Sequence, residues 1–139
     1  MRAPFTQLYV HLVWSTWDRA PLITPEIQTR LYAAMLDTCK AMKCDPIAIG
    51  GIDNHIHLLI RLHPTVAVAD LVKNIKGSSS HLVNHEIKPG SDFRWQGAYG
   101  AFTIRENEVE LVTAYLLNQP AHHAKNHLQA FFEQTDIAD

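Results

Sequence analysis

The sequence predicts an α+β domain built around an antiparallel sheet. Short apolar runs with a strand-like composition occur at four places along the chain. Amphipathic segments with helical spacing occur after the first run, before the last run and after the last run. The resulting order is strand, helix, strand, strand, helix, strand, helix. This is the split βαβ plan of a ferredoxin-like domain with an additional C-terminal helix.

The first half of the chain contains a strand, a helix and a hairpin. Residues 7–16 are rich in Leu, Tyr, Val and Trp and predict the first strand. Residues 24–26 supply an N-cap oxygen, a proline at the first helical position and an acid, so a helix begins there. Apolar residues at helical spacing continue this helix to about residue 43. Residues 45–52 and 55–62 are two short apolar strands joined by a tight turn.

The second half adds two helices and the last strand. Helical spacing returns over residues 68–83, although Gly77 and three serines lower the helix propensity of this segment. Residues 93–95 and 99–104 predict strand segments, and Asn107 is expected to cap a third helix.

The composition is that of one soluble globular domain spanning residues 1–139. Apolar residues make up 47% of the chain and charged residues 19%. No signal peptide and no long apolar run are present, so we expect a cytoplasmic protein with no membrane segment. Cys39 and Cys44 fit no zinc motif and are expected to be free thiols. The net charge of −2 weighs mildly against a nucleic-acid partner, although a local basic face matters more than the sum.

Nine of the 139 residues are histidines, which directs attention to metal-binding patterns. His55 and His57 are two apart in a predicted strand, so their imidazoles point to the same face and can ligate one divalent cation. The alternative is a chance alternation with Ile56 and Leu58 on a half-exposed strand. Because the flanks are apolar and buried imidazoles need partners, the spacing indicates a candidate metal site.

Tyr115 and Gln119 form a second candidate group. They are four apart in the predicted third helix and therefore share one face. The carboxamide oxygen of Gln119 is a suitable ligand for Mg²⁺ or Mn²⁺, and the phenol of Tyr115 is a weak nucleophile until it is activated. The alternative is that Tyr115 packs in the core and Gln119 lies on the surface. His122 and His123 can equally be a cationic pair at the end of a helix.

Four motifs in the same order resemble the HUH single-tyrosine transposases, the small enzymes of the simplest bacterial and archaeal insertion sequences. They are His55-Ile56-His57, Lys76-Gly77-Ser78-Ser79-Ser80, Trp95-Gln96-Gly97-Ala98-Tyr99-Gly100-Ala101-Phe102 and Tyr115-Leu116-Leu117-Asn118-Gln119. The resemblance extends from the first predicted strand to the third helix. Pro120 departs from the family pattern and is expected to kink the helix just beyond Gln119 or to act as a hinge.

The resemblance implies a reaction and a set of roles. His55 and His57 would be metal ligands, Gln119 would complete the site, and Tyr115 would attack a DNA phosphodiester to give a 5′-phosphotyrosine and a free 3′-hydroxyl. The metal would be Mg²⁺ or Mn²⁺. Because transesterification conserves the energy of the broken bond, no nucleotide cofactor is expected, and the chain has no Gly-rich phosphate loop.

The resemblance also implies the partners. These are single-stranded DNA with hairpins near the element ends, and a second copy of the chain in a homodimer whose tyrosine helices can complete each other's sites. The candidate DNA contacts are Lys73, Lys76, Arg94 and Arg105, with Lys88 less certain. For each, the alternative is a solvated side chain. Trp95 and Tyr99 can stack on bases, but core packing is favoured. Asn54 can orient the histidine strand or cap a turn, and the turn is favoured.

Three other interpretations share some of these features. One is a host-adopted relative that processes repeated hairpins in a chromosome with the same chemistry. A replication or plasmid-transfer initiator shares the histidine pair, but such proteins are usually longer. A non-catalytic ferredoxin-like module that binds metal or nucleic acid needs no phenol beside the histidines.

Overall fold

A four-stranded antiparallel sheet forms the centre of the protein, as the computed structural model of residues 2–124 and 130–137 shows. The strand order is β2-β3-β1-β4. The strands are β1 (Tyr9–Ser15), β2 (Asp45–Ile52), β3 (His55–Arg61) and β4 (Gly100–Ile104). The predicted ferredoxin-like α+β fold is therefore confirmed, and β2 has the bounds expected from the sequence.

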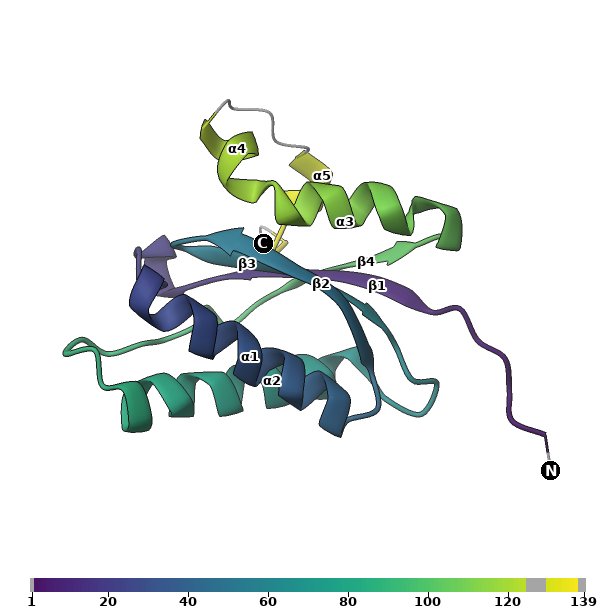
Figure 1. Ribbon diagram of the computed structural model, residues 1–139, viewed down its shortest axis with the longest axis horizontal. Coiled ribbons are helices and arrows are strands. Elements are labelled where there is room, and N and C mark those ends of the chain that lie inside the picture. The colour runs from purple at the N-terminus through teal and green to yellow at the C-terminus, as the bar shows by residue number, and fades with distance from the viewer. Residues whose placement is uncertain (1, 125–129, 138–139) are drawn as a thin grey trace.

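The helices form a layer on each face of the sheet (Figure 1). Helices α1 (Pro25–Ala41) and α2 (Val68–Leu82) lie side by side against one face. Helix α3 (Val109–Leu117) lies on the other face, followed there by the short α4 (Gln119–Ala124) and α5 (Ala130–Glu133). None of the helices within the described residues is both long and apolar enough to cross a membrane.

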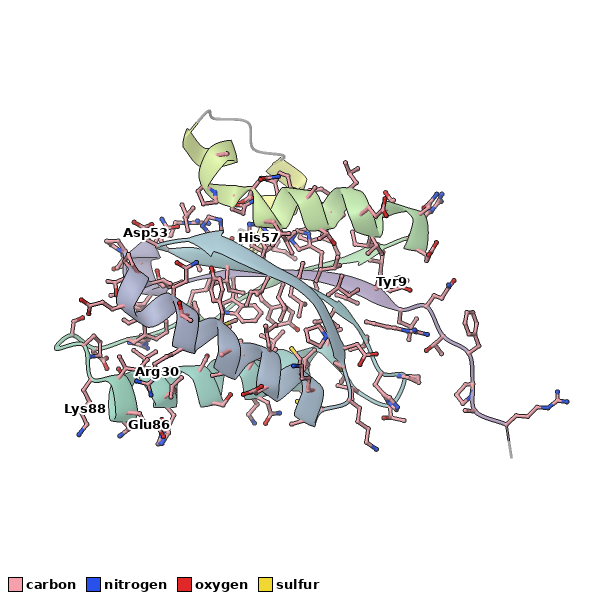
Figure 2. All side chains as sticks on the ribbon, in the orientation of Figure 1. Tyr9, Arg30, Asp53, His57, Glu86 and Lys88 are labelled. Atoms are coloured by element: carbon pink, nitrogen blue, oxygen red, sulfur yellow. The ribbon has the colours of Figure 1, made fainter. Side chains whose placement is uncertain are left out.

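Strand β3 is hydrogen-bonded to β2 on one side and to β1 on the other. In its register with β1, His57 lies opposite Val13 and His55 lies opposite Ser15. Directly opposed residues in a sheet point to the same face, and successive residues point to opposite faces. The two histidines therefore point toward α3, and Figure 2 shows His57 on that side of the sheet.

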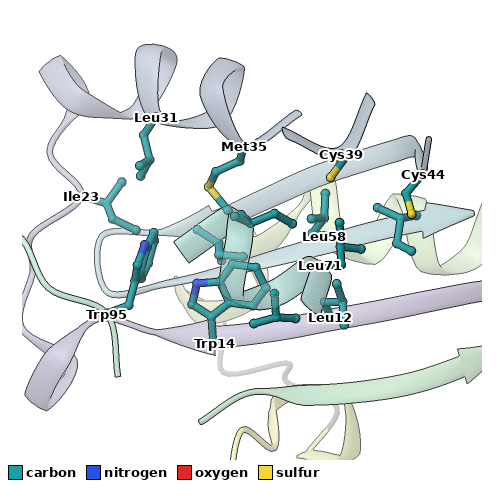
Figure 3. Close-up of a cluster of buried hydrophobic side chains, with 14 of the residues drawn as sticks. Leu12, Trp14, Ile23, Leu31, Met35, Cys39, Cys44, Leu58, Leu71 and Trp95 are labelled. Atoms are coloured by element: carbon teal, nitrogen blue, oxygen red, sulfur yellow. The ribbon is translucent and has the colours of Figure 1, made fainter. Parts of the chain in front are cut away.

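The other face carries the main apolar core, between the sheet and the pair α1 and α2 (Figure 3). Its largest fully buried side chains include Trp14, Leu12, Leu31, Met35, Leu58 and Leu71. The serine-containing segment of α2 is helical, and its fully buried Ser79 donates to the Ile75 carbonyl at 2.6 Å and accepts from Trp95 Nε1 at 3.0 Å. Cys39 and Cys44 are free and buried here, and burial raises the pKa of Cys39 to about 12.

Two local predictions were wrong. Residues 93–95 form no strand, because the side chain of Asn84 takes both backbone hydrogen bonds of Phe93 and Trp95 makes only an isolated bridge to Thr16. Asn107 does not cap a helix but lies within a 3₁₀ turn, η3 (Glu106–Glu108). Glu108 Oε1 instead accepts a hydrogen bond from the Arg105 N–H at 3.1 Å and stabilises the turn that leads into α3.

Helix α3 approaches the sheet closely at Gly50 in β2. A Cβ atom built on Gly50 would lie 2.0 Å from the backbone oxygen of Leu116. The residue next to Leu116 is Tyr115, so this close approach sets how deeply the tyrosine sits over the sheet. Glycine is needed here because it has no side chain, and a helix backbone occupies the space.

We expect the Gly50→Ala substitution to lower the free energy of unfolding by about 1–3 kcal/mol, because its methyl group must push α3 off the sheet. Gly77→Ala is the matched control. Nothing lies within 4 Å of a Cβ atom on Gly77, and alanine is favoured within a helix, so stability should rise by about 0.5–1 kcal/mol. Urea denaturation measures both changes, and equal effects of the two substitutions would contradict the inferred contact.

Candidate metal and tyrosine site

The site lies between β3 and α3. His55 and His57 come from β3 and are 3% and 0% exposed, and Tyr115 comes from α3 and is 4% exposed. The rings of His57 and Tyr115 meet edge to face, with centroids 6.0 Å apart. The structure therefore brings the two predicted groups together within one chain.

Gln119 also reaches the site, although the helix breaks before it. Helix α3 ends at Leu117, and Gln119 begins α4 with Pro120 in the second position. The break thus precedes Gln119 rather than following it, because proline is accommodated in a first helical turn, where its missing N–H needs no partner. Gln119 is fully buried; its Oε1 lies 3.3 Å from His55 Nε2, and its amide nitrogen donates to the Tyr115 carbonyl at 3.3 Å.

A carboxylate that the sequence did not predict completes this group. Glu133, at the end of α5, places Oε1 at 3.2 Å from His55 Nε2 and 3.1 Å from His57 Nε2. Its Oε2 accepts a hydrogen bond of 2.6 Å from the Tyr115 hydroxyl. Burial alone would raise the pKa of Glu133, but the hydrogen bonds from His55, His57 and Tyr115 outweigh burial and hold that pKa well below its usual range. The carboxylate is therefore ionised at neutral pH.

Asn54 fixes the orientation of His55. The Asn54 side-chain oxygen lies 2.8 Å from His55 Nδ1, so the ring donates its Nδ1 proton there. Nε2 of the same ring then faces the oxygens of Glu133 and Gln119. Two acceptor oxygens so close to Nε2 need either a hydrogen on that nitrogen or a divalent cation between the three atoms. The interpretation of Asn54 as a turn residue is confirmed, and its side chain contacts the site as well.

His11 on β1 orients the second histidine. Its Nε2 lies 2.8 Å from His57 Nδ1, and the two rings stack with centroids 5.1 Å apart. Burial, and then the charge of His57, lower the pKa of His11 to about 3, so His11 is neutral. Burial likewise lowers the pKa of His57. The bond between the rings can run in either direction, and when His57 donates, its Nε2 lone pair is available to a metal.

These donors fit a divalent cation. Among the described residues, His55, His57 and Glu133 each offer a ligand atom, and the three atoms lie within 4.8 Å of one another. With Gln119 Oε1, the set contains two imidazole nitrogens and two oxygens, a mixture that suits Mn²⁺ and related divalent ions. The side chains of His122 and His123 lie outside the described part of the structure.

The predicted DNA contacts lie in different places. Lys73 and Lys76 are on α2, so the sheet separates them from Tyr115 (Figure 1). The Lys76 ammonium donates to the carbonyls of Gln96 and Ala98 at 2.9 and 2.8 Å, and burial lowers the pKa of Lys76 to about 8. Lys76 therefore holds residues 96–98, which lead to β4, against α2.

The aromatic residues of that segment pack inward. Trp95 is 7% exposed, and Tyr99 packs against the same core, so the favoured prediction of core packing is confirmed for both. Arg94, Arg105 and Lys88 are exposed. The guanidinium of Arg94 lies 3.9 Å from the ring centroid of Trp17, and Trp17 is 46% exposed. Trp17 comes two residues after Ser15, the last residue of β1, which pairs with His55.

Sequence reasoning missed Glu133 and His11. Glu133 is 18 residues beyond Tyr115, in a segment with no periodic pattern, and nothing in the sequence predicts that it returns to β3. For His11, the two-residue period of the first strand does identify its face. The strand register that places it against His57 is not visible in the sequence.

Comparisons with known proteins relate the chain to DNA transposases. A family model described as "Transposase IS200 like" matches residues 4–119. The ISDra2 transposase TnpA of Deinococcus radiodurans is 25% identical over 118 residues, which cover 81% of this chain and 84% of that protein.

Two solved structures have the same fold. A candidate transposase from Deinococcus radiodurans R1 has a TM-score of 0.68 at 22% identity, and the match covers 86% of this chain and 95% of that one. A REP-associated tyrosine transposase bound to a REP hairpin has a TM-score of 0.65 at 15% identity, and the match covers 100% of this chain and 92% of that one. These likenesses extend the sequence match to the whole fold.

Because the Lys76 ammonium bonds two backbone carbonyls, we expect its removal to lower the stability of the fold. We expect Lys76→Met to lower the free energy of unfolding by roughly 1–3 kcal/mol, because two carbonyls lose a charged donor. The exposed Lys73→Met, on the same helix, should change stability by less than about 0.5 kcal/mol. Thermal or urea denaturation measures both, and a Lys76→Met protein as stable as the Lys73→Met protein would contradict this role.

Proposed function

The chain belongs to the IS200-like transposase family, and from this premise we propose that it cuts and rejoins single-stranded DNA through a 5′-phosphotyrosine intermediate. The observation that carries the proposal is the position of the Tyr115 hydroxyl, which shares the Glu133 carboxylate with the nitrogens of His55 and His57. A tyrosine that only packs in the core needs no such polar surroundings.

In this proposal His55, His57 and Gln119 hold a divalent cation such as Mg²⁺ or Mn²⁺. When bound, the cation supplies Lewis-acid stabilisation of the charge that develops on the scissile phosphate. Asn54 and His11 keep the two imidazoles in the orientation that ligation requires.

The tyrosine performs the covalent step. The phenol oxygen of Tyr115 forms a bond to phosphorus as the bond from phosphorus to the 3′ oxygen breaks, and the hydroxyl proton ends on the released 3′-hydroxyl. A second 3′-hydroxyl then attacks the phosphotyrosine, which restores the phenol and rejoins the strand. Each step exchanges one phosphodiester for another, so the reaction needs no nucleotide cofactor.

The proposed substrate is single-stranded DNA that carries a hairpin. The solved relative with a bound REP hairpin supports this substrate. Trp17, whose ring packs against Arg94, offers an exposed surface on which an unpaired base can stack near the His55 end of the sheet. Lys73, Arg94 and Arg105 are proposed phosphate contacts. A homodimer with exchanged tyrosine helices remains a prediction from the family resemblance. In the structure, Tyr115 lies beside His55 and His57 of its own chain.

Tyr115→Phe should abolish the covalent adduct with labelled hairpin-bearing single-stranded DNA, because no oxygen remains to attack phosphorus. DNA affinity should be unchanged, and EDTA added before the DNA should prevent the wild-type adduct from forming. A denaturing gel resolves the adduct, and a filter-binding assay measures affinity.

The matched control is Tyr9→Phe, because Tyr9 is on the same sheet face but pairs with Arg61 at the far end of β3. This control should form the adduct normally. An adduct formed by the Tyr115→Phe protein would show that Tyr115 is not the nucleophile. A folded wild type that binds the hairpin in Mn²⁺ without forming an adduct would favour a binding module.

Removing the group behind His57 should weaken the metal site. We expect His11→Leu to lower Mn²⁺ affinity about 10–100-fold, the usual effect of losing a partner that orients a ligand. Free Mn²⁺ measured by electron paramagnetic resonance gives the affinity without DNA. His63→Ala is the control, because within the described residues the side chain of His63 forms hydrogen bonds with the neighbouring Thr65. Unchanged affinity in His11→Leu would refute the orienting role.

A further inference from the structure

One carboxylate connects the two halves of the site. Glu133 directs Oε1 to the imidazole nitrogens of His55 and His57 and Oε2 to the Tyr115 hydroxyl. The first two groups are the proposed metal ligands, and the third is the proposed nucleophile.

The segment that carries Glu133 is firmly docked on both sides of it. Phe132 is 7% exposed and packs against the rings of Tyr115 and His11, with centroids 5.3 and 5.2 Å away. On the other side, a Cβ atom on Gly100 would lie 1.9 Å from the Gln134 backbone oxygen. Thr135 is 4% exposed and accepts from the Gln96 amide at 3.5 Å. The backbone of Glu133 is therefore held against the sheet by contacts that do not involve its own side chain.

The distances match those expected of atoms that share a cation. In an octahedral site with bonds of about 2.1 Å, adjacent donor atoms lie about 3 Å apart. Glu133 Oε1 lies 3.2 Å from His55 Nε2 and 3.1 Å from His57 Nε2. The carboxylate thus occupies a position adjacent to both nitrogens, and it can become a ligand with little movement.

We propose that Glu133 is an additional metal ligand through Oε1 and the positioning residue for Tyr115 through Oε2. The carboxylate then holds the phenol oxygen beside the cation, so the nucleophile and the metal occupy one rigid unit. This inference rests on the proposed function, because it assigns a role within the same site. It makes the segment after the tyrosine helix part of the catalytic machinery.

Glu133→Gln tests both roles with a side chain of the same shape. Mn²⁺ affinity, measured by electron paramagnetic resonance without DNA, should fall at least about tenfold because a charged ligand is lost. At Mn²⁺ concentrations that saturate the variant, adduct formation with the hairpin DNA should stay slower than in the wild type, because Tyr115 has lost its ionised acceptor. Asp136→Asn removes an exposed carboxylate three residues away and should change neither value.

A second variant tests the docking. Gly100→Ala must displace the Gln134 backbone, and it should weaken Mn²⁺ binding while leaving the side chain of Glu133 intact. Unchanged Mn²⁺ affinity in Glu133→Gln, or an adduct that forms as fast or faster, would overturn the proposal and make the segment only a cover over the site. In that case the wild-type adduct and its loss in Tyr115→Phe would still stand. An adduct that survives in Tyr115→Phe would instead refute the proposed function.

Discussion

The burial of two imidazoles in the middle of a sheet is the constraint on which the rest of this structure depends. Strand β3 is paired on both sides, and His55 and His57 are 3% and 0% exposed, so their nitrogens are withdrawn from the bulk solvent. Buried polar groups are costly without partners. The partners come from Asn54 in the hairpin turn, His11 in β1 and Glu133 in α5. Two distant parts of the chain, together with the adjoining hairpin turn, are thereby tied to one strand.

A second constraint is the depth at which the tyrosine helix lies. The backbone of α3 contacts the sheet where Gly50 leaves room, and Gly100 leaves similar room for the C-terminal segment. These two glycines sit on opposite edge strands of the sheet, β2 and β4. The site lies between them, so the absence of two side chains permits the convergence of the functional ones. Substitution at either position should reach Tyr115 or Glu133 through the backbone.

The sequence was informative where chemistry follows local periodicity. The two-residue period of a strand places His55 beside His57, and a four-residue separation keeps Gln119 near Tyr115 even though the helix breaks between them. It was uninformative where contacts depend on the tertiary path of the chain. Glu133 returns from a segment without a pattern, and a lysine expected at the surface, Lys76, is folded inward onto two carbonyls.

In the proposed function, the charge of Glu133 gives a reason for a carboxylate in a site that would also accept DNA. Ligation requires neutral imidazoles, so a divalent cation held by His55, His57 and Gln119 alone would bring two uncompensated positive charges beside Tyr115. With Glu133 ionised, the net charge falls to one, which equals in magnitude the single negative charge of a phosphodiester. The carboxylate therefore strengthens cation binding while it weakens the attraction for phosphate. Because the two effects have opposite signs, in the proposed function the same residue would set the balance between holding the metal and releasing the DNA.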